Sequence, residues 1–376
     1  MQNIYKKILN LLSRFKGSEI PSMYSKFKPV YKPDSEISKL AEKNISPVIN
    51  GNEVTFIYKG KVKRHIAVIS ETTHWSNLGF YLKKLRGKDI YHITIELPED
   101  ARLEYKYIID NEWYLDPFNK NRCDNGIGGQ NSYVTMPKYQ RIWEIHKRKG
   151  KSYGNVQLFE MEGKAIPGIR RVYVYTPPGY NENSDNYPVI YIQDGQEYFE
   201  RCRVDNIADN LIQDKKIQPL IMVMINPIDR GFEYIMNPYY TDLVIKEIIP
   251  RVDKRFRTIA TPDGRGIIGA SLGGLISVYV ALTHPDIFSK AGSQSGAFIH
   301  VQYQMEELIE RIPLQPVSFY LDAGRFEDSL IQSNHRIIKL LEQKGYKYFY
   351  QEVSQGHTWT SWSDHFKDAL LYFWGK

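Results

Sequence analysis

The sequence predicts an α/β domain with a mainly parallel sheet, preceded by an all-β sandwich domain. Three observations indicate this arrangement. The chain has 376 residues, which suits two domains better than one. Short β-rich segments follow one another in the first half, whereas apolar strands alternate with helical patterns in the second. We therefore divide the chain into an N-terminal extension (1–40), a β-sandwich (41–140) and an α/β domain (150–376).

The N-terminal extension opens with "MQNIYKKILNLLSRFKGSEIP", in which Lys, Ser and Arg interrupt a short apolar patch. It lacks the continuous apolar segment and cleavage site of a secretory signal, and no run of 18 apolar residues exists. We expect a short amphipathic helix here and no membrane span. Cys123 and Cys202 form neither a metal motif nor a disulfide framework. These features favour a cytoplasmic protein.

The β-sandwich is predicted from short segments rich in β-branched and aromatic residues, separated by turn residues such as Gly60, Pro98 and Gly128. In "IIDNEWYL" the Asp110-Asn111 pair predicts a tight hairpin turn. The predicted strands are "VTFIYKG", "HIAVISE", "IYHITIELP", "LEYKYIID", "EWYLD" and "NSYVTMP". Residues 138–152 read as a charged linker.

The α/β domain is predicted from continuous apolar runs, which are typical of buried parallel strands. Its predicted strands are "RRVYVYTPPGY", "YPVIYIQDG", "PLIMVMIN", "GIIGA", "VSFYLDAG" and "YFYQEV". Helical spacing lies between them, in 241–256 and in 329–345, where Gly345 is a good C-terminal cap. The end of the chain, "SDHFKDALLYFWGK", predicts a closing helix.

The motif "GASLG", with Ser271 at its centre, lies between the strand "RGIIGA" and a helical segment that stops before Pro285. Gly269 and Gly273 leave room for a strained turn, the nucleophile elbow of α/β-hydrolases. There the serine hydroxyl is exposed, and the Leu272 N–H is one expected oxyanion donor. The bare motif has low specificity, but its position between strand and helix favours Ser271 as a nucleophile.

A serine nucleophile needs a base and an acid, which follow it in the order Ser, acid, His in this fold. Of the nine histidines, His357 stands in a loop directly after a predicted strand, so we expect it to be the base. The acid should follow "VSFYLDAG", where Glu327 and Asp328 are adjacent; we favour Glu327 and leave Asp328 open. The second oxyanion donor is expected in "DGQEYF", at Gln196 or Gly195.

These segments resemble the esterase family that includes the enterochelin (ferric enterobactin) esterases. The likeness is carried by "YIQDGQEYF", "NPIDRGFEY", "IIPRVDKRFRT", the long stretch around Ser271, "DAGRFED" and "QGHTWTSW". The first half is similar to the early-set immunoglobulin-like module of such enzymes, through "LEYKYIIDNEWYLDPFNKN" and "GIGGQNSYVTMP". The resemblance implies that Ser271 and His357 are catalytic, with the acid at Glu327. It also covers feruloyl and acetyl-xylan esterases and acyl transferases.

The charge and the aromatic residues suggest the partners. The net charge is +7 without a nucleic-acid-binding motif, which indicates a solvated basic surface or the steering of an anionic ligand. Arg230 is a candidate for binding such a ligand. Trp359 and Trp362 either stack on substrate rings or close the core under the last helix. We expect no metal site or cofactor, no nucleic acid, and a small ester substrate; a homo-oligomer is compatible with the sequence.

The sequence therefore predicts a serine esterase whose substrate is a siderophore trilactone, an anionic ferric catecholate. Two alternatives stay open within the class, a carbohydrate esterase of the feruloyl or acetyl type and a general carboxylesterase. A third alternative is of another class: a glycan-binding protein with a vestigial hydrolase domain, because the β module resembles glycan-binding modules.

Overall fold

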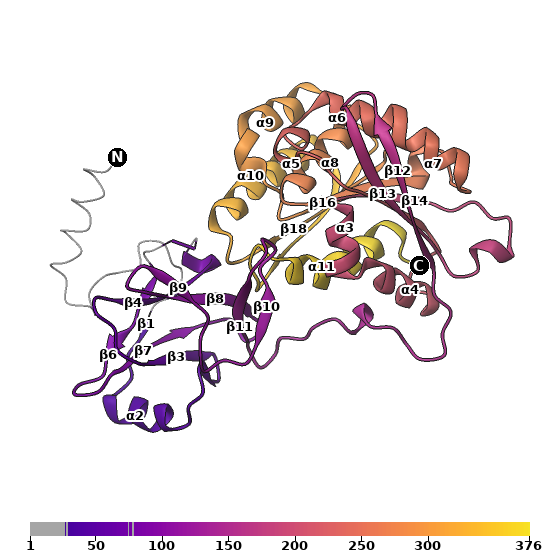
Figure 1. The fold of residues 1–376 in the computed structure, drawn as a ribbon. Helices are drawn as coiled ribbons and strands as arrows, with labels where there is room; N and C mark the ends of the chain where they lie inside the picture. The colour runs from indigo at the N-terminus through magenta and orange to yellow at the C-terminus, as the bar shows by residue number, and fades with distance from the viewer. Residues whose placement is uncertain (1–26, 28, 74, 77–78) are drawn as a thin grey trace. The chain divides into compact units, whose positions relative to one another are not determined.

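The structure, a computed structural model, describes residues 27, 29–73, 75, 76 and 79–376 (Figure 1). The amphipathic helix predicted for residues 1–21 lies outside them. The chain divides into two compact units, of which the first ends at Gln140 and also includes Ser354–Gly356. The second comprises Arg141–Val353 and His357–Lys376. No helix in the described part is long and apolar enough to cross a bilayer.

The first unit contains two antiparallel sheets, as the sequence predicts. One has the order β1-β7-β3-β2 with β6 paired to β7, and the other has the order β10-β11-β8-β4-β5 with β9 paired to β8. The strands are β1 (Pro29–Val30), β2 (Val48–Asn50), β3 (Glu53–Lys59), β4 (Ile66–Ser70), β5 (Phe80–Tyr81), β6 (Lys83–Lys84), β7 (Ile90–Glu96), β8 (Arg102–Ile109), β9 (Glu112–Tyr114), β10 (Arg122–Asp124) and β11 (Gln130–Thr135).

Aromatic side chains form the core between these sheets. Phe56 of β3 packs edge-on against Tyr105 of β8, with ring centroids 4.8 Å apart. The buried hydroxyls of Tyr105 and Tyr107 donate to Asp116 Oδ2 at 2.7 and 3.3 Å, which satisfies that buried carboxylate. Helix α2 (Asp34–Glu42) and the turn η1 (Glu71–Thr73) complete the unit.

The hairpin turn between β8 and β9 also has the predicted tight form. Asp110 and Asn111 adopt φ values of 52° and 76°. Positive φ at both central residues defines a type I′ turn, which suits the twist of a two-residue hairpin.

The second unit is built on an eight-stranded sheet of order β12-β13-β15-β14-β16-β17-β18-β19. Strand β13 runs antiparallel to β12 and β15, and the strands in the order β15-β14-β16-β17-β18-β19 are parallel to one another. This mixed, mainly parallel sheet is that of an α/β-hydrolase. The strands are β12 (Asn155–Gly163), β13 (Gly168–Thr176), β14 (Val189–Gln193), β15 (Ile221–Ile225), β16 (Arg265–Ala270), β17 (Lys290–Gln294), β18 (Ser318–Gly324) and β19 (Lys347–Val353).

Helices cover both faces of this sheet (Figure 1). Alternate residues of β14 point to opposite cores: Val189 and Tyr191 join one cluster, and Ile190 and Ile192 join the other. The first cluster includes side chains of α7 (Ile249–Arg255), α8 (Leu272–Thr283), α9 (Gln302–Arg311) and α10 (Asp328–Lys344). The second includes side chains of α4 (Val204–Gln213) and α11 (Trp359–Trp374).

Shorter segments connect these elements. They are η2 (Trp143–Ile145), η3 (Tyr180–Glu182), α3 (Gly195–Glu197), η4 (Tyr198–Cys202), α5 (Arg230–Glu233), α6 (Pro238–Asp242), η5 (Leu243–Ile248), η6 (Pro262–Gly264) and η7 (Phe298–Val301).

The helix predicted over 241–256 is in fact three segments, α6, the π-helical η5 and α7. Pro250 interrupts the helix, because proline has no N–H to complete the regular ladder of backbone hydrogen bonds. The closing helix begins earlier than predicted, at Trp359, where the Thr358 hydroxyl accepts a hydrogen bond from the Ser361 N–H at 3.2 Å. Both tryptophans near His357 therefore lie on α11.

Candidate active site

Ser271 occupies the junction between β16 and α8 with φ 58° and ψ −120°. This backbone conformation is costly for a residue with a side chain and marks a strained turn. Glycines stand two residues before and after Ser271, and a side chain does not fit there: a Cβ on Gly269 would lie 2.5 Å from the Gly273 carbonyl carbon. The Ser271 N–H donates to Gln294 O at 2.8 Å, and its carbonyl accepts from the Ala297 N–H at 3.0 Å. Backbone hydrogen bonds to β17 and to the segment after it therefore fix the turn.

His357 and Glu327 form a pair at the same edge of the sheet as this turn. His357 follows β19 and Glu327 follows β18, so parallel neighbouring strands bring them to the same edge of the sheet. His357 Nδ1 lies 3.2 Å from Glu327 Oε2. The carboxylate is buried at 2% side-chain exposure, whereas the imidazole keeps 34%. Of the two predicted acids, Glu327 contacts the histidine, and Asp328 is the first residue of α10.

Ser295 holds the second oxygen of that carboxylate. Its hydroxyl donates to Glu327 Oε1 at 2.9 Å and accepts from Trp362 Nε1 at 3.0 Å. Trp362 also contacts the imidazole edge-on, with ring centroids 4.9 Å apart at 87°. Ser295 was not predicted from the sequence. Its place directly after β17, in "SQSG", is the signal that would have identified it.

The turn after β14 brings the predicted oxyanion donors Gly195 and Gln196 to the same edge. Asp194 has φ 53°, and a Cβ on Gly195 would lie 2.2 Å from the Met224 carbonyl carbon, so glycine is required there. The Gln196 N–H donates to Asn226 Oδ1 at 2.7 Å. Leu272 is the first residue of α8, where a helix leaves its N–H groups without intrahelical partners.

A comparison with known protein families identifies this arrangement. The family described as "Putative esterase" matches residues 163–373, which is more than half of the chain. The chain belongs to this esterase family.

Two curated relatives have esterase names, and one solved structure has a similar fold. The chain is 21% identical to the iron(III) enterobactin esterase of Dickeya dadantii, over 77% of this chain and 78% of the relative. It is 27% identical to an endo-1,4-beta-xylanase/feruloyl esterase of Xylanibacter ruminicola, over 68% of this chain and 36% of that protein. The enterochelin esterase structure from Shigella flexneri has a TM-score of 0.72 at 20% identity, covering 92% of this chain and 99% of that one.

Arg230 of this esterase was predicted to bind the substrate, but in the structure its guanidinium contacts groups of the protein itself. Its Nε and Nη2 contact the Asp194 carboxylate at 2.9 and 3.0 Å, and Nη2 also donates to Ala270 O at 3.0 Å. Burial raises the pKa of Asp194, and the guanidinium opposes that shift. The positive charge is thus already paired within the protein.

Trp362 of the esterase is likewise an internal residue. It is 5% exposed in the core beside α4 and packs against Trp359 with centroids 4.7 Å apart. A substrate ring cannot stack on a face that the protein covers, so Trp362 is placed in packing rather than in substrate binding. Trp359 is half-buried and contacts Tyr198 edge-on at 5.6 Å.

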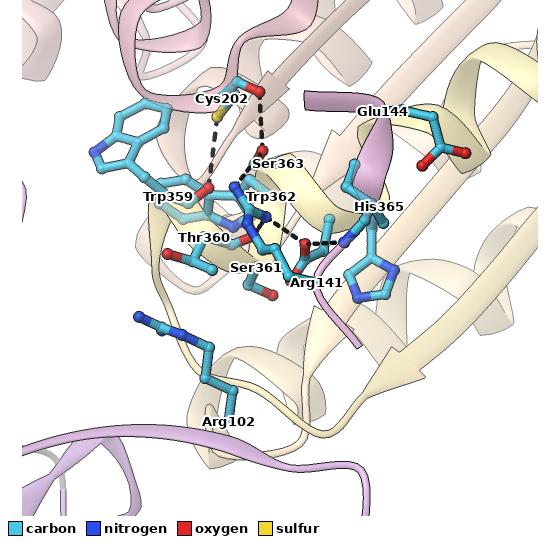
Figure 2. Close-up of polar contacts among 12 residues, drawn as sticks. Arg102, Arg141, Glu144, Cys202, Trp359, Thr360, Ser361, Trp362, Ser363 and His365 are labelled. Atoms are coloured by element: carbon cyan, nitrogen blue, oxygen red, sulfur yellow. Dashed lines mark hydrogen bonds and ion pairs between the residues drawn. The ribbon is translucent and has the colours of Figure 1, made fainter. Parts of the chain in front are cut away.

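Hydrogen bonds from Arg141, in the segment before η2, connect that segment to the start of α11 (Figure 2). Arg141 donates to Thr360 O at 3.1 Å and to Ser363 Oγ at 2.9 Å, and it forms an ion pair with the buried Asp364. Ser363 Oγ in turn donates to Cys202 O at 2.9 Å. These bonds fix the helix that carries both tryptophans of the site.

A buried carboxylate, Asp322, lies at the end of β18. It accepts hydrogen bonds from Gln294 Nε2 and the Tyr320 hydroxyl, both at 3.0 Å. Burial raises its pKa to about 6, because the charged form loses solvation. Among the described residues, no group of three or more His, Cys, Asp or Glu side chains is arranged to hold a metal ion.

Proposed function

We propose that this esterase is a serine carboxylic-ester hydrolase. One observation carries the proposal: a strained serine turn and a His–Glu pair lie at the carboxyl ends of β16, β18 and β19. A nucleophile, a base and an acid in that chain order are the components of acyl transfer in this fold.

In the proposed mechanism, Ser271 attacks the ester carbonyl while His357 accepts its proton. Glu327 stabilises the imidazolium that forms, because its buried carboxylate faces Nδ1. The Leu272 N–H and an N–H of the 195–196 turn stabilise the oxyanion. His357 then protonates the leaving alcohol, and the same residue activates water to release the acid.

For the substrate we propose a siderophore trilactone carrying catecholate groups. The support is the basic chain, with a net charge of +7, and likeness over both units to proteins named enterobactin or enterochelin esterases. A feruloyl or acetyl ester of a carbohydrate is the second candidate, since the Xylanibacter relative is named a feruloyl esterase. We propose a cytoplasmic location for either activity.

The test compares the wild-type protein with Ser271→Ala on enterobactin, with and without iron, by mass spectrometry. Ser329→Ala is the matched control, because Ser329 is an exposed serine of α10. We expect linear dihydroxybenzoyl-serine products from wild type and control only, with a loss of several orders of magnitude in Ser271→Ala.

The other outcomes separate the candidates. Intact trilactone together with hydrolysis of methyl ferulate would move the substrate to carbohydrate esters. Full activity in Ser271→Ala would reject the nucleophile. Retention on glycogen or starch without hydrolysis of any ester would favour the glycan-binding alternative.

A further inference from the structure

Arg230 connects two segments that are far apart in the sequence. Its guanidinium contacts both oxygens of Asp194, at 2.9 and 3.1 Å from Nε, and it donates from Nη2 to Ala270 O at 3.0 Å. Asp194 directly precedes the turn that contains Gly195 and Gln196. Ala270 directly precedes Ser271 and the Leu272 N–H. The Arg230 side chain therefore contacts the Asp194 carboxylate next to one proposed oxyanion donor and the Ala270 carbonyl next to the other.

Asp194 itself is fixed from several sides. Its N–H donates to the Tyr234 hydroxyl at 3.0 Å, and its side chain is only 4% exposed. Tyr234 also lies under the guanidinium, with Arg230 Cζ 5.5 Å from the ring centroid. A planar guanidinium held by a bidentate carboxylate and an aromatic ring has little freedom to rotate toward a ligand.

The two segments also contact each other directly, and not only through Arg230. A Cβ on Gly273 would lie 3.0 Å from Gln193 Cβ and 3.2 Å from Asp194 Oδ2. The serine turn and the 194–196 turn are therefore in contact, and small displacements of either would change the distance between their N–H groups. Preorganised donors contribute to catalysis only when that distance is right for the oxyanion.

We propose that Arg230 is a positioning residue that sets the relative placement of the two oxyanion donors, rather than a residue that binds the substrate. This inference rests on the proposed function. It predicts that Arg230 acts on the rate of acylation and not on the binding of charged groups.

The kinetic test uses Arg230→Gln and Arg230→Lys on one neutral and one anionic ester of the same alcohol. We expect kcat to fall about 10- to 100-fold in Arg230→Gln, by the same factor for both esters, with KM within about two-fold of wild type. Lysine should restore little, because a point charge cannot make the bidentate and carbonyl contacts together. Arg171→Gln is the matched control, since Arg171 forms an exposed ion pair with Glu160 of the edge strand β12.

Hydrogen–deuterium exchange tests the same idea without any turnover. Arg230→Gln should raise exchange in both 193–197 and 269–274, and free guanidinium should partly reverse the rise. A KM increase confined to the anionic ester, or unchanged exchange in both segments, would overturn the proposal. If the wild-type protein hydrolyses no ester, the proposed function fails. The exchange result then still decides whether Arg230 stabilises the two turns.

Discussion

Ser295 is the residue whose role follows most directly from its contacts. Its hydroxyl occupies the position between Trp362 Nε1 and Glu327 Oε1, so it links the acid of the proposed triad to a buried ring. That ring also supports the face of His357. Ser295 therefore orients the carboxylate that orients the base, and it makes no proposed contact with the substrate.

We predict that Ser295→Ala lowers kcat about 10-fold and leaves KM nearly unchanged. The substitution removes a hydrogen bond to a charged group and leaves Trp362 Nε1 without its acceptor, at a cost of about 2 kcal/mol. Steady-state kinetics on a p-nitrophenyl ester would measure the effect. Ser289→Ala, which removes a hydroxyl remote from Glu327, is the control; equal loss in both variants would contradict the assignment.

Asp322 gives a prediction on pH. Its pKa in the folded protein is about 6, above the ordinary value of 3.8, so the folded state holds its proton more tightly than the unfolded state does. Its contribution to stability is therefore largest below pH 4 and is lost as pH rises through 6, by about 2 to 3 kcal/mol.

The test for Asp322 is chemical denaturation of wild type and Asp322→Asn between pH 4.5 and 8. We expect the free energy of unfolding of Asp322→Asn relative to wild type to become more favourable as pH rises across this range. A difference that stays constant with pH would contradict the shifted carboxylate.

At the scale of single residues, chain order and strand position were enough to predict the pairing of His357 with a nearby acid. They favoured Glu327 but left Asp328 open, because the direction of each side chain depends on the φ and ψ angles where α10 begins. Nor could they show that Arg230 is already paired, since its partners Asp194 and Ala270 are 36 and 40 residues away.

Among the elements, α11 carries Trp362, whose ring contacts both Ser295 and His357. Arg141 donates to Thr360 O and Ser363 Oγ in its first turns (Figure 2). The same guanidinium forms an ion pair with the buried Asp364. Because Arg141 lies in the segment predicted only as a charged linker, its role could not be read from composition. The contact joins residues 141 and 364, a separation that no local pattern reports.

We predict that Arg141→Met destabilises the second unit by about 3 kcal/mol, because it removes the guanidinium that pairs with the buried Asp364 carboxylate. Urea denaturation followed by tryptophan fluorescence would report the loss. The double variant Arg141→Met/Asp364→Leu should recover part of it, since the buried charge is then gone as well. A double variant as unstable as the sum of its parts would contradict a specific ion pair.

Strands were predicted well where β-branched residues dominate and poorly where small residues do. The sequence of β17, "KAGSQ", has low β propensity, yet the strand is fully paired between β16 and β18. A Cβ on Gly292 would lie 2.5 Å from Ile268 side-chain atoms, so close packing selects the small residue. Edge strand β12 was missed because its side chains are mostly exposed and its pattern is polar.

For the whole molecule, the two units contain buried groups that respond to acid in opposite directions. In the first unit, His92 is buried, and neither ring nitrogen forms a hydrogen bond with a residue that the structure describes. Burial, followed by the charge of Lys83, lowers its pKa. A histidine with a lowered pKa loses folded-state stability as pH falls below about 6.5, its unfolded value. Asp322 in the second unit has the opposite dependence.

We therefore predict that calorimetry resolves two unfolding transitions whose temperatures respond in opposite directions to a change from pH 7.5 to pH 5. The first unit should shift to lower temperature, and the second should shift relatively upward. His92→Leu should remove the shift of the first transition, and Asp322→Asn should remove that of the second. Two transitions that move together in both variants would contradict this division.

The hydrogen bond from the Gln196 N–H to Asn226 Oδ1 has a consequence for selectivity. If the Gln196 N–H is the second oxyanion donor that we propose, the Asn226 amide oxygen is an internal competitor for it, and an incoming carbonyl gains only the difference between two hydrogen bonds. An ester that fits the rest of the site loosely would leave the competitor in place. Selectivity at this position would then depend on how tightly the rest of the site binds the substrate, before any bond is broken.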